Sequence, residues 1–198
     1  MIPPAYQRAI EILVTVFPPP TLLLIGAHAV NAWTPDERHS RVTHDIDFFA
    51  DCPPEQLQET ARRLQELGYT VRIKEGQSDD PVPLYLALSA PDLPPVDILI
   101  ATREYERDFI RNGTSVDNFP VPIADIHDLL VMEIKANSEI DRLDIRQLLT
   151  TATAAIDLDT LMARANQLCT PAELIVLREL IDSGGAGPRP DHSHLHLH

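Results

Sequence analysis

The spacing of apolar residues changes character at Ile123, and this change limits the possible folds more than any other feature of the sequence. Before Ile123, short apolar runs alternate with helical segments, a pattern typical of a sheet covered by helices. After it, apolar residues recur at helical spacing as far as Ile181. We therefore predict an α+β fold: a mixed β-sheet with flanking helices over residues 1–122, followed by a helical C-terminal extension over residues 123–182.

The individual elements follow from this periodicity and from the residues that interrupt it. Three prolines at positions 18–20 end the first predicted helix, Gly26 ends the first strand, and Gly68 ends a helix. The predicted strands span residues 21–25, 42–50, 69–74, 84–88 and 96–101, and residues 116–121 are either irregular chain or an edge strand. The predicted helices span residues 5–17, 27–33, 54–67, 105–111, 124–137, 139–154, 158–168 and 171–182.

The composition indicates a globular protein and argues against a large nucleic-acid surface. Apolar residues make up 44% of the 198 residues, and the formal net charge is −14. Proteins that neutralise many phosphates usually have a basic surface. We therefore expect no long double-stranded DNA as a partner, although a small patch near a site can still hold a nucleotide or the end of a tRNA.

The cysteines and the apolar stretches predict the cellular compartment, and the composition of the last residues predicts a tail. The two cysteines, Cys52 and Cys169, belong to no CxxC or Cys/His cluster, which indicates free thiols in a reducing cytoplasm. No signal-peptide layout is visible, and the longest apolar stretch, residues 22–33, is too short to span a bilayer. We expect a cytoplasmic protein without a membrane partner. The His-rich residues 183–198 are interpreted as a disordered or tag-like tail and carry no functional argument.

Asp45 and Asp47 are the first candidate site residues. They lie two positions apart on the predicted strand over residues 42–50, so both side chains point to the same face, about 7 Å apart along the strand. Thr43 shares that face. Two carboxylates so placed repel each other, and a divalent cation removes the problem. Oxygen ligands of this kind suit Mg²⁺ or Mn²⁺.

Asp97 is the third candidate site residue. It is unusual because it lies in the apolar run Val96-Asp97-Ile98-Leu99-Ile100. An ionised group in a buried strand is costly unless it is paired or bound to a metal. Three carboxylates from adjacent strands can hold two metal ions at the separation that phosphoryl chemistry needs. In addition, the strand–Gly26–helix motif places free N–H groups of a helix N-terminus where phosphate oxygens can bind.

These motifs together resemble the nucleotidyltransferase superfamily with the polymerase-β-like fold, and more closely the AbiEii-type or related minimal nucleotidyltransferases of toxin–antitoxin and phage-defence systems. The resemblance covers roughly residues 22–149. It is carried by the segments Leu24–Ala29, Arg41–Phe49 and Val96–Leu99, with support from Ala124–Ala136 and Asp141–Arg146.

The resemblance implies a two-metal nucleotidyl transfer from an NTP to tRNA or to a protein, with a cognate antitoxin as a possible protein partner. Asp45 and Asp47 would bridge both Mg²⁺ (or Mn²⁺) ions and the triphosphate, and Asp97 would hold the catalytic ion and help to deprotonate the acceptor hydroxyl. Further residues are implied to contact the nucleotide or to support the Asp-x-Asp strand: Gly26, Ala27, Arg41, Thr43 and Lys135.

One departure leaves two alternatives open. Relatives in this superfamily usually carry Gly-Ser or Gly-Gly where this chain has Gly26-Ala27, so the hydroxyl that would grip the phosphates is missing. A non-catalytic relative that binds a nucleotide or a partner is therefore the alternative hypothesis, and the helical extension could serve mainly as an oligomer or antitoxin surface. A P-loop NTPase and a hydrolase of the Gly-x-Ser-x-Gly type are excluded, because neither motif occurs.

Overall fold

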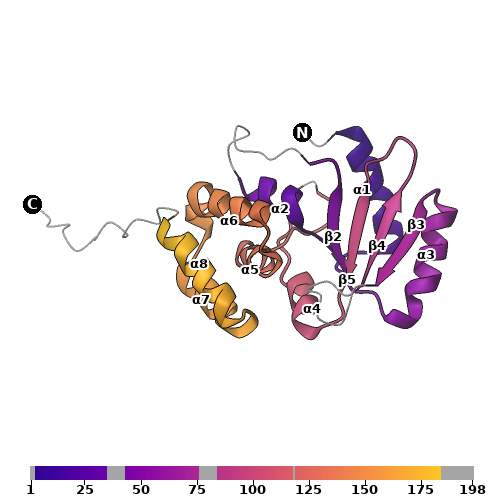
Figure 1. Cartoon of the computed structure of the whole chain (residues 1–198). Coiled ribbons are helices and arrows are strands. Elements are labelled where there is room, and N and C mark those ends of the chain that lie inside the picture. Colours follow the sequence, from indigo (N-terminus) through magenta and orange to yellow (C-terminus); the bar gives the residue numbers. More distant parts are fainter. Residues whose placement is uncertain (1–2, 35–42, 76–83, 118, 184–198) are drawn as a thin grey trace, which may run out of the picture.

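The computed structural model describes residues 3–34, 43–75, 84–117 and 119–183, and these residues form a mixed five-stranded sheet with helices around it (Figure 1). The strand order is β1-β2-β5-β4-β3, in which β2 and β5 run parallel and the other neighbours run antiparallel. The predicted α+β class is confirmed. The strands are β1 (Leu22–Leu24), β2 (Ile46–Ala50), β3 (Thr70–Glu75), β4 (Leu84–Ser89) and β5 (Val96–Ile100).

Eight α-helices and two 3-10 turns complete the described part of the chain. None of these helices has the length and apolar character needed to cross a membrane. The helices are α1 (Pro4–Val16), α2 (Gly26–Trp33), α3 (Leu57–Glu66), α4 (Glu104–Arg111), α5 (Ile126–Ala136), α6 (Glu139–Thr151), α7 (Leu158–Leu168) and α8 (Pro171–Ser183), and the turns are η2 (Pro54–Gln56) and η3 (Thr153–Ala155).

The two faces of the sheet belong to different hydrophobic clusters. Ile46, Phe48 and Ile98 are buried on one face, together with residues of α1 and α3. Phe49 points to the other face and belongs to the cluster built by α2 and α5–α8. This alternation is the period of two that strands impose. Figure 1 accordingly shows α1 and α3 on one side of the molecule and α6–α8 on the other.

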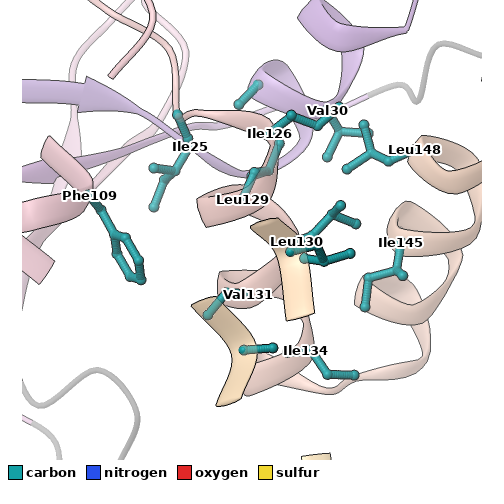
Figure 2. Packing of buried hydrophobic residues seen from close by; sticks show 14 of the residues in the cluster. Ile25, Val30, Phe109, Ile126, Leu129, Leu130, Val131, Ile134, Ile145 and Leu148 are labelled. Carbon is teal, nitrogen blue, oxygen red and sulfur yellow. The ribbon is translucent and has the colours of Figure 1, made fainter. Parts of the chain in front are cut away.

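Helix α5 is the centre of the helical part. Asp125 caps its N-terminus by accepting hydrogen bonds from the backbone N–H groups of His127 and Asp128, and Asn137 ends it in a left-handed conformation. Its apolar side chains contact residues of α2 and α6 on several sides, as Figure 2 shows for Val30, Ile145 and Leu148. A helix buried around most of its circumference explains why the sequence is apolar beyond a single stripe.

Several predicted bounds differ from the structure. Strand β2 begins at Ile46, so Asp45 lies in a bend before the strand and not on it. The prediction of a single helix over residues 54–67 was wrong, because the prolines start a 3-10 turn before α3 begins at Leu57. Helix α6 ends at Thr151, and η3 follows it. In the described residues of 116–121 the chain is irregular.

Some predictions are not tested by the described residues. The His-rich tail from residue 184 onward and the segment 35–42, which contains Arg41, lie outside them. The proposed boundary at Ile123 also stays a prediction. Ile123 itself forms isolated bridges with Leu24 and Thr114, so the chain is still paired with the sheet where the helical pattern begins.

A buried carboxylate joins three segments of the helical part. The Asp128 side chain on α5 is 1% exposed and accepts hydrogen bonds from Arg164 Nε at 2.8 Å and Arg164 Nη2 at 2.7 Å, on α7. Asn112, directly after α4, donates a third hydrogen bond at 3.1 Å. Removing Asp128 leaves Arg164, whose side chain is 26% exposed, without its counter-charge.

We predict that Asp128→Ala lowers the free energy of unfolding by about 3 kcal/mol, because Arg164 loses its partner inside the protein. Arg62→Ala is the matched control: Arg62 pairs with Glu59 and Glu66 on the exposed surface of α3. Exposed pairs contribute at most about 1 kcal/mol. Urea unfolding measures both values, and equal losses in the two variants would contradict this role for Asp128.

Candidate active site

Asp47 and Asp97 are direct neighbours across the parallel pair β2–β5. The register aligns Asp47 with Asp97, and the preceding pair, Ile46 with Val96, is buried on the opposite face. Neighbouring strands lie about 4.8 Å apart. Both carboxylates therefore stand on the same face of the sheet, next to the pair formed by Phe49 and Leu99. The register thus brings together two of the three predicted site carboxylates.

Gly26 allows the start of α2 to lie directly against the Asp47 side chain. Its φ is +60°, and a β-carbon at this position would lie 2.5 Å from Asp47 Oδ2. The backbone N–H of Ile25 donates to the carbonyl of Asp47 at 3.0 Å. Only glycine combines this backbone conformation with so close an approach. The first turn of α2, whose N–H groups have no partners within the helix, thus begins beside a carboxylate of the site.

Ala27 follows Gly26 in the first turn of α2. It is 3% exposed, and its methyl group belongs to the protein interior. Any contribution of Ala27 to a bound phosphate must therefore come from its backbone N–H, since the side chain has no polar atom. The contribution of Ala27 to nucleotide binding stays a prediction.

Asp45 is held by short-range contacts and by two helices. Thr43 Oγ1 donates to Asp45 Oδ1 at 2.6 Å. The Tyr6 hydroxyl on α1 donates to the carbonyls of Thr43 and His44, at 3.3 Å each. His28 on α2 hydrogen-bonds to the backbone of Asp45, and its ring meets Tyr6 edge to face at 5.3 Å. Together these contacts explain why Asp45 sits in a bend.

The sequence analysis missed Tyr6 and did not assign His28 to this role. His28 could have been suspected, because it lies in the first turn after Gly26. Tyr6 gave no such signal, since it stands 39 positions before Asp45 on a helix whose apolar spacing reads as ordinary core.

The environment of Asp97 favours its protonated form. Burial, the largest cause, raises the pKa of the Asp97 carboxyl; the charge of Lys74 lowers it, and the charge of Asp45 raises it. A carboxyl with a raised pKa is suited to accept a proton from a substrate.

The carboxylates do not form a closed metal cluster. In the residues that the structure describes, no three His, Cys, Asp or Glu side chains lie close enough together to hold a metal ion. Asp47 Oδ2 faces Gly26, and Asp45 Oδ1 accepts from Thr43. The three carboxylates still provide the oxygen donors that Mg²⁺ and Mn²⁺ prefer, two of them on adjacent strands, so the donor set fits such a cation chemically. Ligation by all three therefore stays a proposal.

A cavity of about 210 Å³ opens beside Asp47, between the sheet and the helices α4 and α5. Apolar and aromatic side chains cover much of it, and four carboxylates also belong to the lining. Its lining consists of Ile25, Gly26, Asp47, Phe49, Leu99, Tyr105, Glu106, Phe109, Met132, Glu133, Lys135, Ala136 and Asp141. Apolar walls with a small number of polar groups are typical of a small-molecule site.

Lys135 lines this cavity and interacts with two other groups of the protein. Its Nζ donates to the carbonyl of Leu168 at 2.9 Å and lies 5.6 Å from the centre of the Tyr105 ring. The predicted contact between Lys135 and phosphate stays a prediction. Tyr105 is a cavity residue that the sequence analysis did not single out.

The comparisons with known proteins bear on the fold. No protein-family model matches the sequence, and no curated protein matches it significantly. Among solved structures, the chain is similar to the Megavirus polyadenylate synthase, with 16% identity and a TM-score of 0.52 over 73% of this chain and 31% of that enzyme. It is also similar to the antibiotic-resistance factor ANT(2'')-Ia, with 13% identity and a TM-score of 0.50 over 89% of this chain and 91% of that protein.

These likenesses show that the chain has the fold of nucleotidyltransferases. The chain spans about a third of the length of the Megavirus enzyme. The comparisons do not support the closer resemblance to AbiEii-type proteins.

We predict that Gly26→Ala damages the site beyond its effect on stability. The positive φ is strained for alanine, by about 1–2 kcal/mol, and the new methyl group must displace the Asp47 carboxylate. Gly68→Ala is the matched control, because its φ is +95° and no atom lies within 4 Å of the added carbon.

Urea unfolding should show similar losses of stability in both glycine variants. Nucleotidyl transfer should fall about a hundredfold only in Gly26→Ala, since a displacement of about 1 Å in a reacting geometry can have that effect. Wild-type transfer rates in Gly26→Ala would contradict the assignment of Asp47 to the site.

We predict that Tyr6→Phe loosens the segment that carries Asp45. Losing the hydrogen bonds to Thr43 and His44 should lower the free energy of unfolding by about 1 kcal/mol. It should also raise the Mg²⁺ concentration needed for half-maximal transfer. Tyr69→Phe is the control, because the buried Tyr69 hydroxyl has no hydrogen-bond partner among the described residues. If the two variants behave alike in both measurements, Tyr6 does not position Asp45.

Proposed function

We propose that this protein is a nucleotidyltransferase that transfers a nucleotide from an NTP to an acceptor hydroxyl. The observation that supports this most directly is the register of β2 and β5, which sets Asp47 beside Asp97 next to the N-terminus of α2. The fold shared with the two structures above supports the same class of reaction.

The reaction begins with binding of the triphosphate at the start of α2. The backbone N–H groups of Gly26 and Ala27 face its oxygens, because the first turn of a helix attracts anions. The nucleoside then occupies the adjacent cavity, where Tyr105 and Met132 offer apolar surface. The cavity of about 210 Å³ holds the nucleoside, and the phosphates lie at Asp47.

The transfer step then requires that the acceptor hydroxyl loses its proton. Asp97 accepts the hydroxyl proton, and the acceptor oxygen forms a bond to the α-phosphorus. The bond between the α-phosphorus and the bridging oxygen breaks, and pyrophosphate leaves. Asp45, Asp47 and Asp97 would hold Mg²⁺ or Mn²⁺, and this charge would neutralise the attacking and leaving oxygens.

A non-catalytic relative is the second candidate, and the Gly26-Ala27 turn is the observation that favours it. A chain without a hydroxyl at position 27 relies on backbone N–H groups and metal to hold the triphosphate. The toxin role and the antitoxin partner rest on the motif resemblance alone and stay predictions. The choice of tRNA or protein as acceptor also stays a prediction.

Transfer of an α-labelled NTP in the presence of Mg²⁺, total tRNA and cell lysate tests the proposed function. We predict labelled product with the wild-type protein and a rate at least a thousandfold lower with Asp47→Asn or Asp97→Asn, since each loses a charge essential to the transition state. Asp92→Asn, in the turn between β4 and β5, controls for the charge change.

Two outcomes separate the candidates. Label transfer that persists in Asp47→Asn would overturn the site assignment. Absence of transfer to every acceptor, together with a clear thermal shift on adding NTP, would favour the non-catalytic relative.

A further inference from the structure

Two rows of side chains cross the open face of the sheet from the Asp47–Asp97 pair to the edge strand β3. Both rows follow from the register of four strands, and each ends in a cation on β3. The first row is Asp47, Asp97, Ala87 and Arg72, and the second is Phe49, Leu99, Tyr85 and Lys74.

The half of this face that β4 and β3 form is separate from the nucleoside cavity. No residue of β3 or β4 lines that cavity, which lies on the side of β2, α4 and α5. Helix α3 covers the opposite face of these strands, where Val71 and Ile73 pack against the core. Asp97 on β5 stands between the cavity and the β4–β3 face. A second substrate on that face would therefore reach Asp97 from the side opposite the NTP.

The cations on this face are unusual for this chain. It contains 30 acidic and 16 basic residues, and only two of the basic residues are lysines, Lys74 and Lys135. Lys135 lines the cavity, and Lys74 acts electrostatically on Asp97. Both lysines of a strongly acidic protein thus lie around the candidate active site.

Arg72, Lys74 and Tyr85 have the chemistry of a single-strand binding surface. Arg72 and Lys74 are exposed and lie about 7 Å apart along β3, each free to reach a different phosphate. The guanidinium of arginine can hold a phosphate with two parallel hydrogen bonds. The Lys74 ammonium lies 4.9 Å from the centre of the half-buried Tyr85 ring, which offers a stacking surface in the row of Leu99. Cations beside an aromatic ring are typical of proteins that bind single strands.

We propose that Arg72, Lys74 and Tyr85 bind the acceptor, and that the acceptor is the single-stranded end of an RNA. The inference rests on the proposed nucleotidyl transfer and names the substrate class of that site. Arg72 and Lys74 bind backbone phosphates near the terminus, Tyr85 stacks on a base, and the terminal hydroxyl reaches Asp97. The proton passes to Asp97, and pyrophosphate leaves from the opposite side.

Edge protection is the competing explanation of the two cations. Charged side chains on an edge strand prevent it from pairing with other chains. If edge protection is the only role of Arg72 and Lys74, replacing them affects the solubility of the protein and leaves acceptor binding unchanged. The two explanations therefore differ in what the loss of Arg72 and Lys74 does to RNA binding.

The test measures binding of a fluorescent single-stranded RNA of mixed sequence to the full chain by anisotropy, over a range of salt concentrations. The double variant Arg72→Gln/Lys74→Gln should lower affinity at least tenfold and reduce the slope of log K against log salt by about 2, because each phosphate contact contributes about 1. Arg146→Gln/Arg178→Gln is the matched control, with the same charge change at exposed positions of α6 and α8.

Tyr85 gives a second variant in the same binding experiment. Tyr85→Leu should lower affinity about tenfold through lost stacking, and Tyr85→Phe should keep it. The thermal shift caused by NTP should be unchanged in all variants, since none of them lines the nucleoside cavity.

The outcomes separate this inference from the proposed function. Equal affinity and salt slope in the test and control double variants would overturn the RNA surface, as would a wild-type protein that binds no single strand or labels only a protein. In those cases, transfer that still requires Asp47 would leave the proposed function standing. Loss of both NTP binding and transfer in the wild type would remove the proposed function itself.

Discussion

The parallel pairing of β2 with β5 is the interaction on which the rest of the candidate site depends. It fixes Asp47 opposite Asp97 and leaves the neighbouring apolar side chains to fill the core on the reverse face. A slip of one residue would turn every one of these side chains to the wrong face. Burial of Ile46, Phe48 and Ile98 therefore determines the position of the two carboxylates, so the hydrophobic effect specifies the geometry of a polar site.

The remaining parts of the site are arranged around this pair by three separate contacts. Gly26 lets the start of α2 approach Asp47, the α1 residue Tyr6 and the α2 residue His28 hold the segment before β2, and α5 closes the cavity. The ion pair of Asp128 with α7 secures α5 from its far side. Elements from both halves of the sequence thus contribute to a single site.

The fold class could be predicted from the sequence because apolar periodicity distinguishes short strands from helices. Asp97 could be singled out as a candidate site residue because a carboxylate in an apolar strand is an anomaly. The sequence could not predict the bend at Asp45, which arises from a Thr43 side-chain bond and from contacts with α1 that lie far away in sequence. It also could not predict that Lys135 donates a hydrogen bond to the Leu168 carbonyl, because this contact depends on how the chain after α5 packs. The rows that lead to β3 follow from strand order, and strand order was not visible in the sequence.

The proposed reaction depends most on Asp47 and Asp97 binding the cation that accompanies a triphosphate. A crystal structure of the full chain with Mn²⁺ and a non-hydrolysable NTP, read by the anomalous scattering of manganese, tests this directly. We predict a manganese peak ligated by Asp47 and Asp97, with the triphosphate at the start of α2 beside Gly26. Manganese bound elsewhere, or a triphosphate placed away from α2, would contradict this assignment of the active site.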